Sequence, residues 1–239
     1  MSFEEYQFKF GNDQHILLKN PPGVFTPTGT TSALVEAAST YIKKPGKLLD
    51  LGCGNGVVGI AMYEMGLVEE PLNASDLSED AVEIMNINAK LYNCSVIAKC
   101  GSIFEPWQSE KFDYILNDIS GVAKQVADIS PWFNAIPSES GEDGTDLIVK
   151  MLMSAPNHLN EGGVLFFPVI SLSNVDKILE VANNNFSYVE HLSSNEWPLP
   201  KEMTSHVNLL DKMASDKLIR VTKKFGLITF YTDIYVAYN

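Results

Sequence analysis

A short apolar run that ends in a cluster of glycines is the feature that most constrains this chain. The sequence LLDLGCGNGVVGIA places an expected strand, Lys47–Leu51, directly before Gly52, Gly54 and Gly56, and a helical pattern follows from about Val57 to Met65. Glycine lets the backbone turn tightly and approach a ligand closely, and the first turn of a helix offers N–H groups that have no partner within the helix. This stretch therefore predicts a strand, a turn and a helix that together suit a nucleotide-like ligand.

The same rhythm of strand, turn and helix is repeated along the chain. Strands that alternate with helices argue for a parallel sheet covered on both faces, with ligands at the carboxyl ends of the strands. The expected fold class is α/β, a Rossmann-like doubly wound sheet. A helix with its inward face at Ala33–Ile42 precedes the first strand, and Thr28 or Thr30 is its expected cap. Further strands are expected at Leu72–Ser75, Val96–Cys100, Phe112–Asn117 and Val164–Ile170, and further helices at Ser78–Tyr92, Thr145–Leu159 and Asn174–Asn183.

The two ends of the chain depart from this rhythm. Leu218–Thr222 and Ile228–Ala237 are strand-like and are separated only by the turn KKFG, so they are expected to pair as an antiparallel hairpin. Phe8–Phe10 and His15–Leu18 predict short strands at the N-terminus. We therefore expect an N-terminal arm over the ligand site in residues 1–28 and a single domain in residues 29–239.

Composition narrows the classes of partner and compartment. The formal net charge of -13 argues against a nucleic-acid partner without excluding one, because nucleic-acid binders normally carry a basic patch. The three cysteines form no CxxC pair and the four histidines show no metal-ligand spacing, so we expect a reducing, cytoplasmic location and no metal. The N-terminus lacks an apolar stretch and no window is long enough to span a membrane, so no membrane association is expected.

An acidic residue beside the glycine turn bears on the kind of ligand. Asp50 ends the first strand, and a pyrophosphate at the turn would be repelled by its carboxylate at a cost of about 1–4 kcal/mol. S-adenosylmethionine has no phosphate and carries an amino group and a sulfonium, both positive. Asp50 therefore favours S-adenosylmethionine over a dinucleotide. The alternative is that Asp50 only caps the turn.

Two further positions suit the nucleoside part of such a ligand. Asp76 ends the second strand, where a carboxylate can accept hydrogen bonds from both ribose hydroxyls. The loop CGSIFEPW follows the third strand, where Ser102 is expected to bond the adenine amino group and Ile103 to pack on the ring. The alternatives are a helix cap for Asp76 and an ordinary loop after the third strand.

These motifs resemble a known family. Residues 22–170 look like the small-domain class I methyltransferases, a group that includes ribosomal RNA guanine and release-factor glutamine methyltransferases. The resemblance is carried by PGVFTPTGTTSALVEAA, LLDLGCGNGVVGIA, GSIFEPW and GEDGTDLIVKML, and by the terminal hairpin. It implies a seven-stranded sheet of order 3-2-1-4-5-7-6 with strand 7 antiparallel, and S-adenosylmethionine as cofactor. The predicted cofactor-binding residues are Thr28, Asp50, Gly52, Cys53, Gly54, Asn55, Gly56, Asp76, Leu77, Ser102, Ile103 and Asn117.

The chain departs from the family pattern at the end of the fourth strand. The family has [ND]-PP-[YFW] there, whereas this sequence reads NDISG: Asp118 takes the Asn/Asp position, and Gly121 stands in place of the aromatic residue. In the family this motif holds a planar amide or base, and the aromatic ring stacks on it. A flat base or a glutamine amide is therefore not favoured as the acceptor. Ser102 also replaces the usual aspartate of the adenine loop.

Asp118 and Asn117 are the predicted catalytic residues. Methyl transfer is an in-line displacement in which positioning does most of the work, and Asp118 is expected to orient or deprotonate the nucleophile. The alternative is a solvated loop acid. The long segment at about residues 120–143 predicts a lid, or else an insertion packed in the core. The predicted substrate-binding residues are Phe25, Trp132 and Phe133, and NEWPLP (195–200) is another candidate rim.

The sequence as a whole predicts a methyltransferase that uses S-adenosylmethionine and acts on an N or O nucleophile of a small molecule or a protein. One alternative is an RNA or DNA base methyltransferase. Another is a cofactor-binding module without catalysis. A nicotinamide-dependent oxidoreductase is disfavoured by Asp50 and by the terminal hairpin.

Overall fold

The computed structural model describes residues 4–11, 13–119, 121–133 and 140–239. Its centre is a mixed sheet of eight strands. In chain order these are β3 (Leu48–Leu51), β4 (Leu72–Asp76), β5 (Val96–Cys100), β6 (Phe112–Asn117), β7 (Leu159–Ile170), β8 (Tyr188–Pro198), β9 (Thr222–Lys224) and β10 (Leu227–Tyr238). The strands lie in the order β5-β4-β3-β6-β7-β10-β8, and β9 pairs with β10.

The directions of the strands confirm the doubly wound α/β class. β3 to β7 are parallel to one another, whereas β10 runs antiparallel to both β7 and β8. With β3 counted as strand 1 and β9 set aside, the order reads 3-2-1-4-5-7-6. The N-terminal arm forms a separate antiparallel pair, β1 (Glu4–Phe10) and β2 (Gln14–Asn20).

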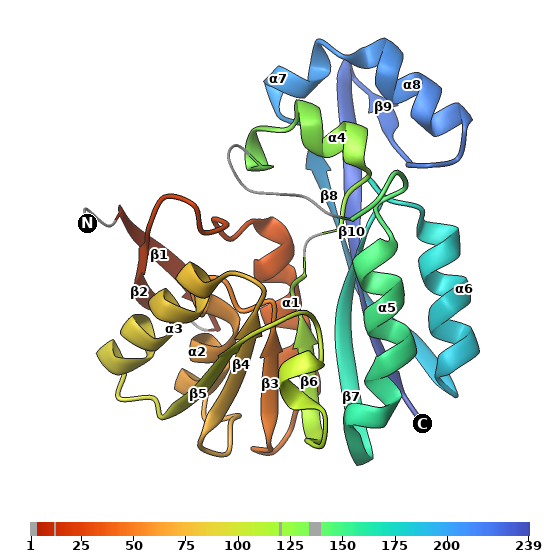
Figure 1. Ribbon diagram of the computed structural model, residues 1–239. Coiled ribbons are helices and arrows are strands. Elements are labelled where there is room, and N and C mark those ends of the chain that lie inside the picture. The colour runs from red at the N-terminus through yellow and green to blue at the C-terminus, as the bar shows by residue number, and fades with distance from the viewer. Residues whose placement is uncertain (1–3, 12, 120, 134–139) are drawn as a thin grey trace.

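The helices fall into three groups (Figure 1). α1 (Gly29–Tyr41), α2 (Val57–Glu64) and α3 (Glu79–Leu91) follow the arm and the first parallel strands, and α5 (Asp146–Ser154) and α6 (Val175–Asn185) flank β7. A third group gathers beyond the parallel strands, around one end of β8 and β10. It consists of α4 (Lys124–Ile129), α7 (Lys201–Thr204) and α8 (Val207–Ser215).

The alternation of side chains along the strands explains why both faces are covered. In β3, Leu48 packs with α1 and α2, whereas Leu49 packs with α5 and α6. In β7, Phe166 joins the first cluster and Phe167 the second. Successive residues of a strand point to opposite faces, so a strand that is apolar at every position must be buried on both sides.

The tail differs from the predicted hairpin. β10 pairs with β9 over three residues only, and its longer partner is β8, from Tyr188 to Pro198. The sequence analysis assigned residues 195–200 to a rim and missed this strand. None of the β8 residues is fully buried. β8 lies at the edge of the sheet. An edge strand lacks the run of buried apolar residues by which an inner strand is recognised in a sequence.

The predicted helix Thr145–Leu159 is also shorter than expected. α5 ends at Ser154, a short 3₁₀ turn covers Ala155–His158, and β7 begins at Leu159. Pro156 lies in that turn, where its missing N–H and its ring prevent an α-helix from continuing.

The predicted insertion is packed in a core over part of its length. Val122 and Val126 are almost fully buried against α7, α8 and β10. That packing supports the alternative to a lid for this part of the insertion. Residue 120 and residues 134–139 lie outside the described part of the chain, so the lid over residues 120–143 stays a prediction.

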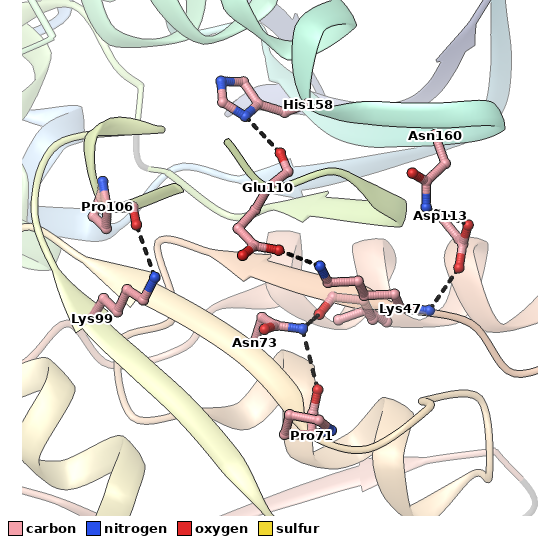
Figure 2. A network of polar contacts seen from close by, with 10 residues as sticks. Lys47, Pro71, Asn73, Lys99, Pro106, Glu110, Asp113, His158 and Asn160 are labelled. Carbon is pink, nitrogen blue, oxygen red and sulfur yellow. Dashed lines mark hydrogen bonds and ion pairs between the residues drawn. The ribbon is translucent and has the colours of Figure 1, made fainter. Parts of the chain in front are cut away.

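Polar contacts tie the strands together at their amino ends (Figure 2). The backbone N–H of Lys47 donates to Oδ2 of Asp113 at 2.8 Å, and Nδ2 of Asn160 donates to Oδ1 of the same carboxylate at 2.8 Å. Nζ of Lys47 also forms an ion pair with Glu110. These contacts link the starts of β3, β6 and β7, so this end of the sheet is structural and the carboxyl ends remain for a binding site.

No described helix has the length and apolar character needed to cross a membrane. The three cysteines are unpaired, with Cys53 and Cys94 buried and Cys100 exposed. Among the described residues, no group of three or more His, Cys, Asp or Glu side chains is arranged to hold a metal ion.

Candidate cofactor and acceptor site

A pocket lies at the carboxyl ends of β3, β4, β5 and β6. β3 leads into α2 on one face of the sheet and β6 leads toward α5 on the other, and such a switch point is where α/β sheets place their ligands. The pocket is therefore the candidate cofactor site. Its described lining residues are Phe25, Pro27, Leu51, Gly52, Cys53, Gly54, Asn55, Val57, Ser75, Asp76, Leu77, Gly101, Ser102, Ile103, Asp118, Ile119, Phe133, Ser140 and Leu147.

The structure brings most of the predicted site residues to this pocket. Those that line it are Phe25, Gly52, Cys53, Gly54, Asn55, Asp76, Leu77, Ser102, Ile103, Asp118 and Phe133. The others lie elsewhere: Thr28 and Trp132 line a neighbouring pocket, Gly56 caps α2, and Asp50 and Asn117 are buried. The role of each residue toward a ligand stays a prediction.

The glycine loop is folded back onto the end of β4. The backbone N–H groups of Gly52 and Cys53 both donate to the carbonyl oxygen of Ser75, at 2.9 and 3.0 Å. The N–H of Gly54 donates to Oδ2 of Asp76 at 2.9 Å. The loop and the end of β4 therefore form one rigid edge of the pocket.

Asp76 lies on the pocket wall with its carboxylate oriented by the backbone. Oδ1 accepts from the N–H of Ser78 at 3.0 Å, while Oδ2 holds the loop at Gly54. A carboxylate has about four lone-pair directions, so each oxygen can still accept one more hydrogen bond. Two neighbouring hydroxyl groups are a ligand that satisfies this geometry.

Asp50 lies beneath the glycine loop, not on its surface. Its side chain is fully buried, and Oδ2 accepts from the N–H of Gly59 in α2 at 2.8 Å. Oδ1 has no partner among the described residues. Burial raises the pKa of this carboxyl to about 8. The strand alternation directs Asp50 toward α2, which is why it does not face the pocket as the sequence analysis expected.

The free energy of unfolding of the ligand-free protein should fall as the pH rises from about 5 to about 8. The carboxyls of Asp50 and Asp118 have pKa values raised from 3.8 to about 8 and about 7, so the folded state keeps protons that the unfolded chain has released. Each group contributes a slope of up to about 1.4 kcal/mol per pH unit. Urea unfolding at pH 5, 6, 7 and 8 measures this. Asp50→Asn should give a shallower slope, and stability that rises over this range would contradict the expectation.

Asp118 stands at the floor of the pocket, next to α1. The hydroxyl of Thr31 donates to its Oδ2 at 2.8 Å, and its own N–H donates to the carbonyl of Leu51 at 3.0 Å. Burial raises the pKa of the Asp118 carboxyl to about 7, and the hydrogen bond from Thr31 opposes that rise. A group that titrates near neutral pH in a pocket is suited to exchange a proton with a ligand.

Two buried polar side chains near the pocket have no hydrogen-bond partner among the described residues. Ser75 Oγ is one of them, and Ser75 lines the pocket. The other is the amide of Asn117, which lies on the opposite face of β6 from Asp118 and outside the lining. Unsatisfied buried groups are uncommon in folded proteins, so the Ser75 hydroxyl indicates a place for a polar ligand atom.

The N-terminal arm is bonded to the elements beside the pocket. Asn88 of α3 exchanges two hydrogen bonds with the backbone of Lys19, both at 2.9 Å, and donates to the carbonyl of Asn55 at 2.8 Å. Nδ2 of Asn55 donates to Oδ1 of Asn20 at 3.0 Å. These asparagines fix β2 against the glycine loop and so place Phe25 and Pro27 at the pocket.

A second pocket adjoins the first and shares Phe25 and Phe133 with it. The centroids of these two rings are 5.6 Å apart, and those of Trp132 and Phe230 are 5.5 Å apart. The predicted substrate-binding residues thus meet at one place. The described lining residues are Phe25, Thr28, Gly29, Thr30, Val122, Trp132, Phe133, Ile170, Trp197 and Phe230.

The sequence analysis missed several residues of the two pockets. Ser75 directly precedes Asp76 at a strand end, and that position was a usable signal. Thr31 and Phe230 carried no such signal, because each reaches its site only through the packing of α1 or β10. Trp197 was expected either to be packed or to line the cleft, and the structure places it in the lining of the second pocket.

Comparison with known proteins agrees with the fold. Residues 15–118 match the family model of the methyltransferase small domain. The chain is 30% identical over 149 residues to a ribosomal protein uL3 glutamine methyltransferase of Francisella tularensis, which covers 60% of this chain and 43% of that protein. It is 27% identical over 152 residues to a release factor glutamine methyltransferase of Geobacter sulfurreducens, which covers 60% and 52%.

A solved structure extends the likeness of fold to nearly the whole chain. The 16S rRNA methyltransferase of T. thermophilus, in complex with AdoMet and guanosine, superposes with a TM-score of 0.67 at 14% identity, over 99% of this chain and 51% of that chain. The chain spans about half the length of the curated relatives it matches. The fold is that of the class I methyltransferases. Within that class, residues 15–118 resemble the methyltransferase small-domain family.

Proposed function

We propose that the chain binds S-adenosylmethionine in the pocket at the carboxyl ends of β3 to β6 and transfers its methyl group to an acceptor. The observation that carries this proposal is the charge of the pocket. Its described lining contains two acidic residues, Asp76 and Asp118, and no Lys, Arg or His. Such a lining attracts a ligand that carries an ammonium and a sulfonium and disfavours one that carries a pyrophosphate.

The parts of the ligand fit the parts of the pocket. The loop at Gly52 and Gly54 would hold the amino-acid head, since an added Cβ on Gly54 would meet no heavy atom within 4 Å. The carboxylate of Asp76 would accept hydrogen bonds from the ribose hydroxyls. Ser102 and Ile103, which also line the pocket, would hold the adenine. Asp50 contributes from below, because it fixes the start of α2 under the loop.

Asp118 is the residue assigned to the acceptor. S-adenosylmethionine, when bound, would supply a methyl group activated by its positive sulfur for transfer to an acceptor N or O, with adenosylhomocysteine as the other product. The carboxylate of Asp118 would orient the acceptor hydrogen and take the proton that is released. Thr31 holds the carboxylate in place for this step.

The acceptor that the chain supports best is a small molecule or a protein group, not a nucleic-acid base. The curated relatives are named as methyltransferases of ribosomal proteins and release factors. The net charge of -13 and the absence of a stacking ring at Gly121 argue against a base. RNA methylation remains an outcome of the test, since the similar solved structure contains guanosine.

The test is to incubate the purified chain with S-adenosylmethionine labelled in its methyl group and with cell extract separated into protein, nucleic acid and small metabolites. Label is expected in the protein or the small-metabolite fraction. Label confined to nucleic acid would overturn the choice of acceptor. Calorimetry with adenosylhomocysteine runs in parallel: tight binding without transfer to any fraction would indicate a binding module without catalysis.

Asp76→Ala is expected to weaken adenosylhomocysteine binding by roughly 1–3 kcal/mol, the usual loss for charge-assisted hydrogen bonds. The carboxylate also orders Gly54, so part of the loss reflects a looser loop. The matched control is Asp80→Ala, an exposed acid in the first turn of α3 that does not line the pocket. Calorimetric titration of both variants measures the effect. Equal affinities in the two variants would remove Asp76 from the site.

Thr31→Val is expected to move the pH dependence of methyl transfer upward. The hydroxyl donates to the charged form of Asp118 and so lowers the pKa of that carboxyl. Without it the carboxylate is present only at higher pH, so the rate at pH 6 should fall more than the rate at pH 9. A uniform loss of rate at every pH would indicate that Thr31 has only a structural role.

A further inference from the structure

The second pocket is built almost wholly from apolar and aromatic groups. None of its described lining residues is charged, and their polar side-chain groups are the hydroxyls of Thr28 and Thr30 and the indole N–H groups of Trp132 and Trp197. Burying an unpaired charge in such surroundings is costly, whereas aromatic walls favour a ring that stacks against them. The aromatic lining residues are Phe25, Trp132, Phe133, Trp197 and Phe230.

This pocket borders the cofactor pocket, and α1 links its wall to Asp118. Phe25 and Phe133 line both pockets. Thr28 and Thr30, at the start of α1, form part of the wall, and the next residue, Thr31, donates to the carboxyl of Asp118 at 2.8 Å.

Gly29 shapes this pocket. A Cβ added to Gly29 would lie 2.8 Å from both Cη2 and Cζ2 of Trp197, which is closer than carbon atoms approach in folded proteins. The absent side chain is what lets the Trp197 ring from β8 lie against the start of α1. Nε1 of Trp197 is buried and has no partner among the described residues, so it is a donor for one uncharged acceptor atom.

We infer that the second pocket binds the methyl acceptor, and that this acceptor is an uncharged small molecule with an aromatic ring. The ring lies among the aromatic side chains and the nucleophilic atom lies toward Asp118. That the bound molecule is the methyl acceptor rests on the proposed function. The chemical class of the occupant rests on the lining of the pocket alone.

The experiment compares three probes that share a toluene ring and differ in charge: p-cresol, 4-methylbenzoate and 4-methylbenzylamine. Each is titrated against the full chain at pH 7 by ligand-observed NMR, with and without adenosylhomocysteine. We expect p-cresol to bind at least tenfold more tightly than either charged probe. Equal affinity of the three probes, or tighter binding of a charged one, would overturn the inference.

Two variants localise the binding to this pocket. Gly29→Ala must displace the Trp197 ring, and Trp132→Ala removes a half-buried aromatic side chain that lines the pocket and lies outside the sheet, so each is expected to weaken p-cresol binding at least fivefold. Phe225→Ala is the matched control, because it removes an aromatic ring that is fully exposed and lines neither pocket. Wild-type p-cresol affinity in both folded variants would place the binding elsewhere and refute the inference.

The two proposals fail in different ways. If adenosylhomocysteine does not bind the wild-type chain while p-cresol binds with the expected preference and the expected variant effects, the proposed methyl transfer is wrong and the class of ligand for the second pocket stands. If adenosylhomocysteine binds and the p-cresol preference is absent, the inference about the acceptor is wrong and the cofactor site stands.

Discussion

Replacing Asp118 with asparagine is expected to slow methyl transfer about 10²–10⁴-fold, the usual contribution of a general base, while the affinity for adenosylhomocysteine, which carries no sulfonium charge, changes little. The amide has the size of the carboxylate and can still accept a hydrogen bond from Thr31, so the pocket keeps its shape. It cannot take a proton from the acceptor. Initial rates with labelled S-adenosylmethionine, and calorimetry with adenosylhomocysteine, measure the two effects separately.

The pH profile makes the role of Asp118 more specific. In the wild type the rate should rise with pH through about 7, where the carboxyl of Asp118 loses its proton, and this inflection should disappear in the asparagine variant. Asp128→Asn is the matched control, since Asp128 is an exposed acid of α4 that pairs with Lys124 and lines neither pocket. A fully active Asp118→Asn variant would mean that another group handles the acceptor proton.

Gly56→Ala is expected to destabilise the fold by about 2–5 kcal/mol and to lower adenosylhomocysteine affinity at least tenfold. Gly56 has a φ of 87°, where an L side chain adds about 1–2 kcal/mol of strain. Its Cβ would also lie 2.2 Å from Sδ of Met85, a fully buried side chain, and such overpacking costs about 1–3 kcal/mol. The loop or the Met85 side chain of α3 must therefore shift.

Thermal unfolding and calorimetry measure this prediction, and the melting temperature should fall by about 5–15 °C. Gly66→Ala separates the two causes. Gly66 also has a positive φ, of 71°, but no heavy atom lies within 4 Å of an added Cβ, and it follows the far end of α2. Gly66→Ala should lower the free energy of unfolding only by the cost of backbone strain, and it should bind adenosylhomocysteine with wild-type affinity. The same behaviour in both variants would show that the contact with Met85 is unimportant.

The position of Asp50 changes the electrostatic argument for the cofactor. The sequence predicted a carboxylate beside the glycine turn that attracts a cationic ligand, and the structure buries this carboxyl beneath the loop with a pKa raised to about 8. The negative character of the described pocket lining comes from Asp76 and Asp118. The preference for a cationic ligand therefore remains, but it comes from Asp76 and Asp118 and not from Asp50.

The sequence alone determined the local units and their class. Apolar strands, the glycine turn and the cap at Ser78 depend on neighbouring residues, so their patterns are visible along the chain, and Ser78 does accept from the N–H of Ala81. Parallel strands bring their carboxyl ends to one edge of a sheet, which is why Gly54, Asp76, Ser102 and Asp118 were predicted at one pocket.

Only the tertiary structure decided how deep each side chain lies and which distant segments meet. Whether Asp50 faces the ligand depends on the packing of α2 beneath the loop, and the partner of Asp118 comes from α1, 87 positions away along the chain. The second pocket joins Gly29 to Trp197 through β8, an edge strand whose exposed residues carry little hydrophobic pattern. Local sequence patterns predict strands, turns and helices because these depend on neighbouring residues. The burial of a side chain and its contacts with distant segments depend on tertiary packing.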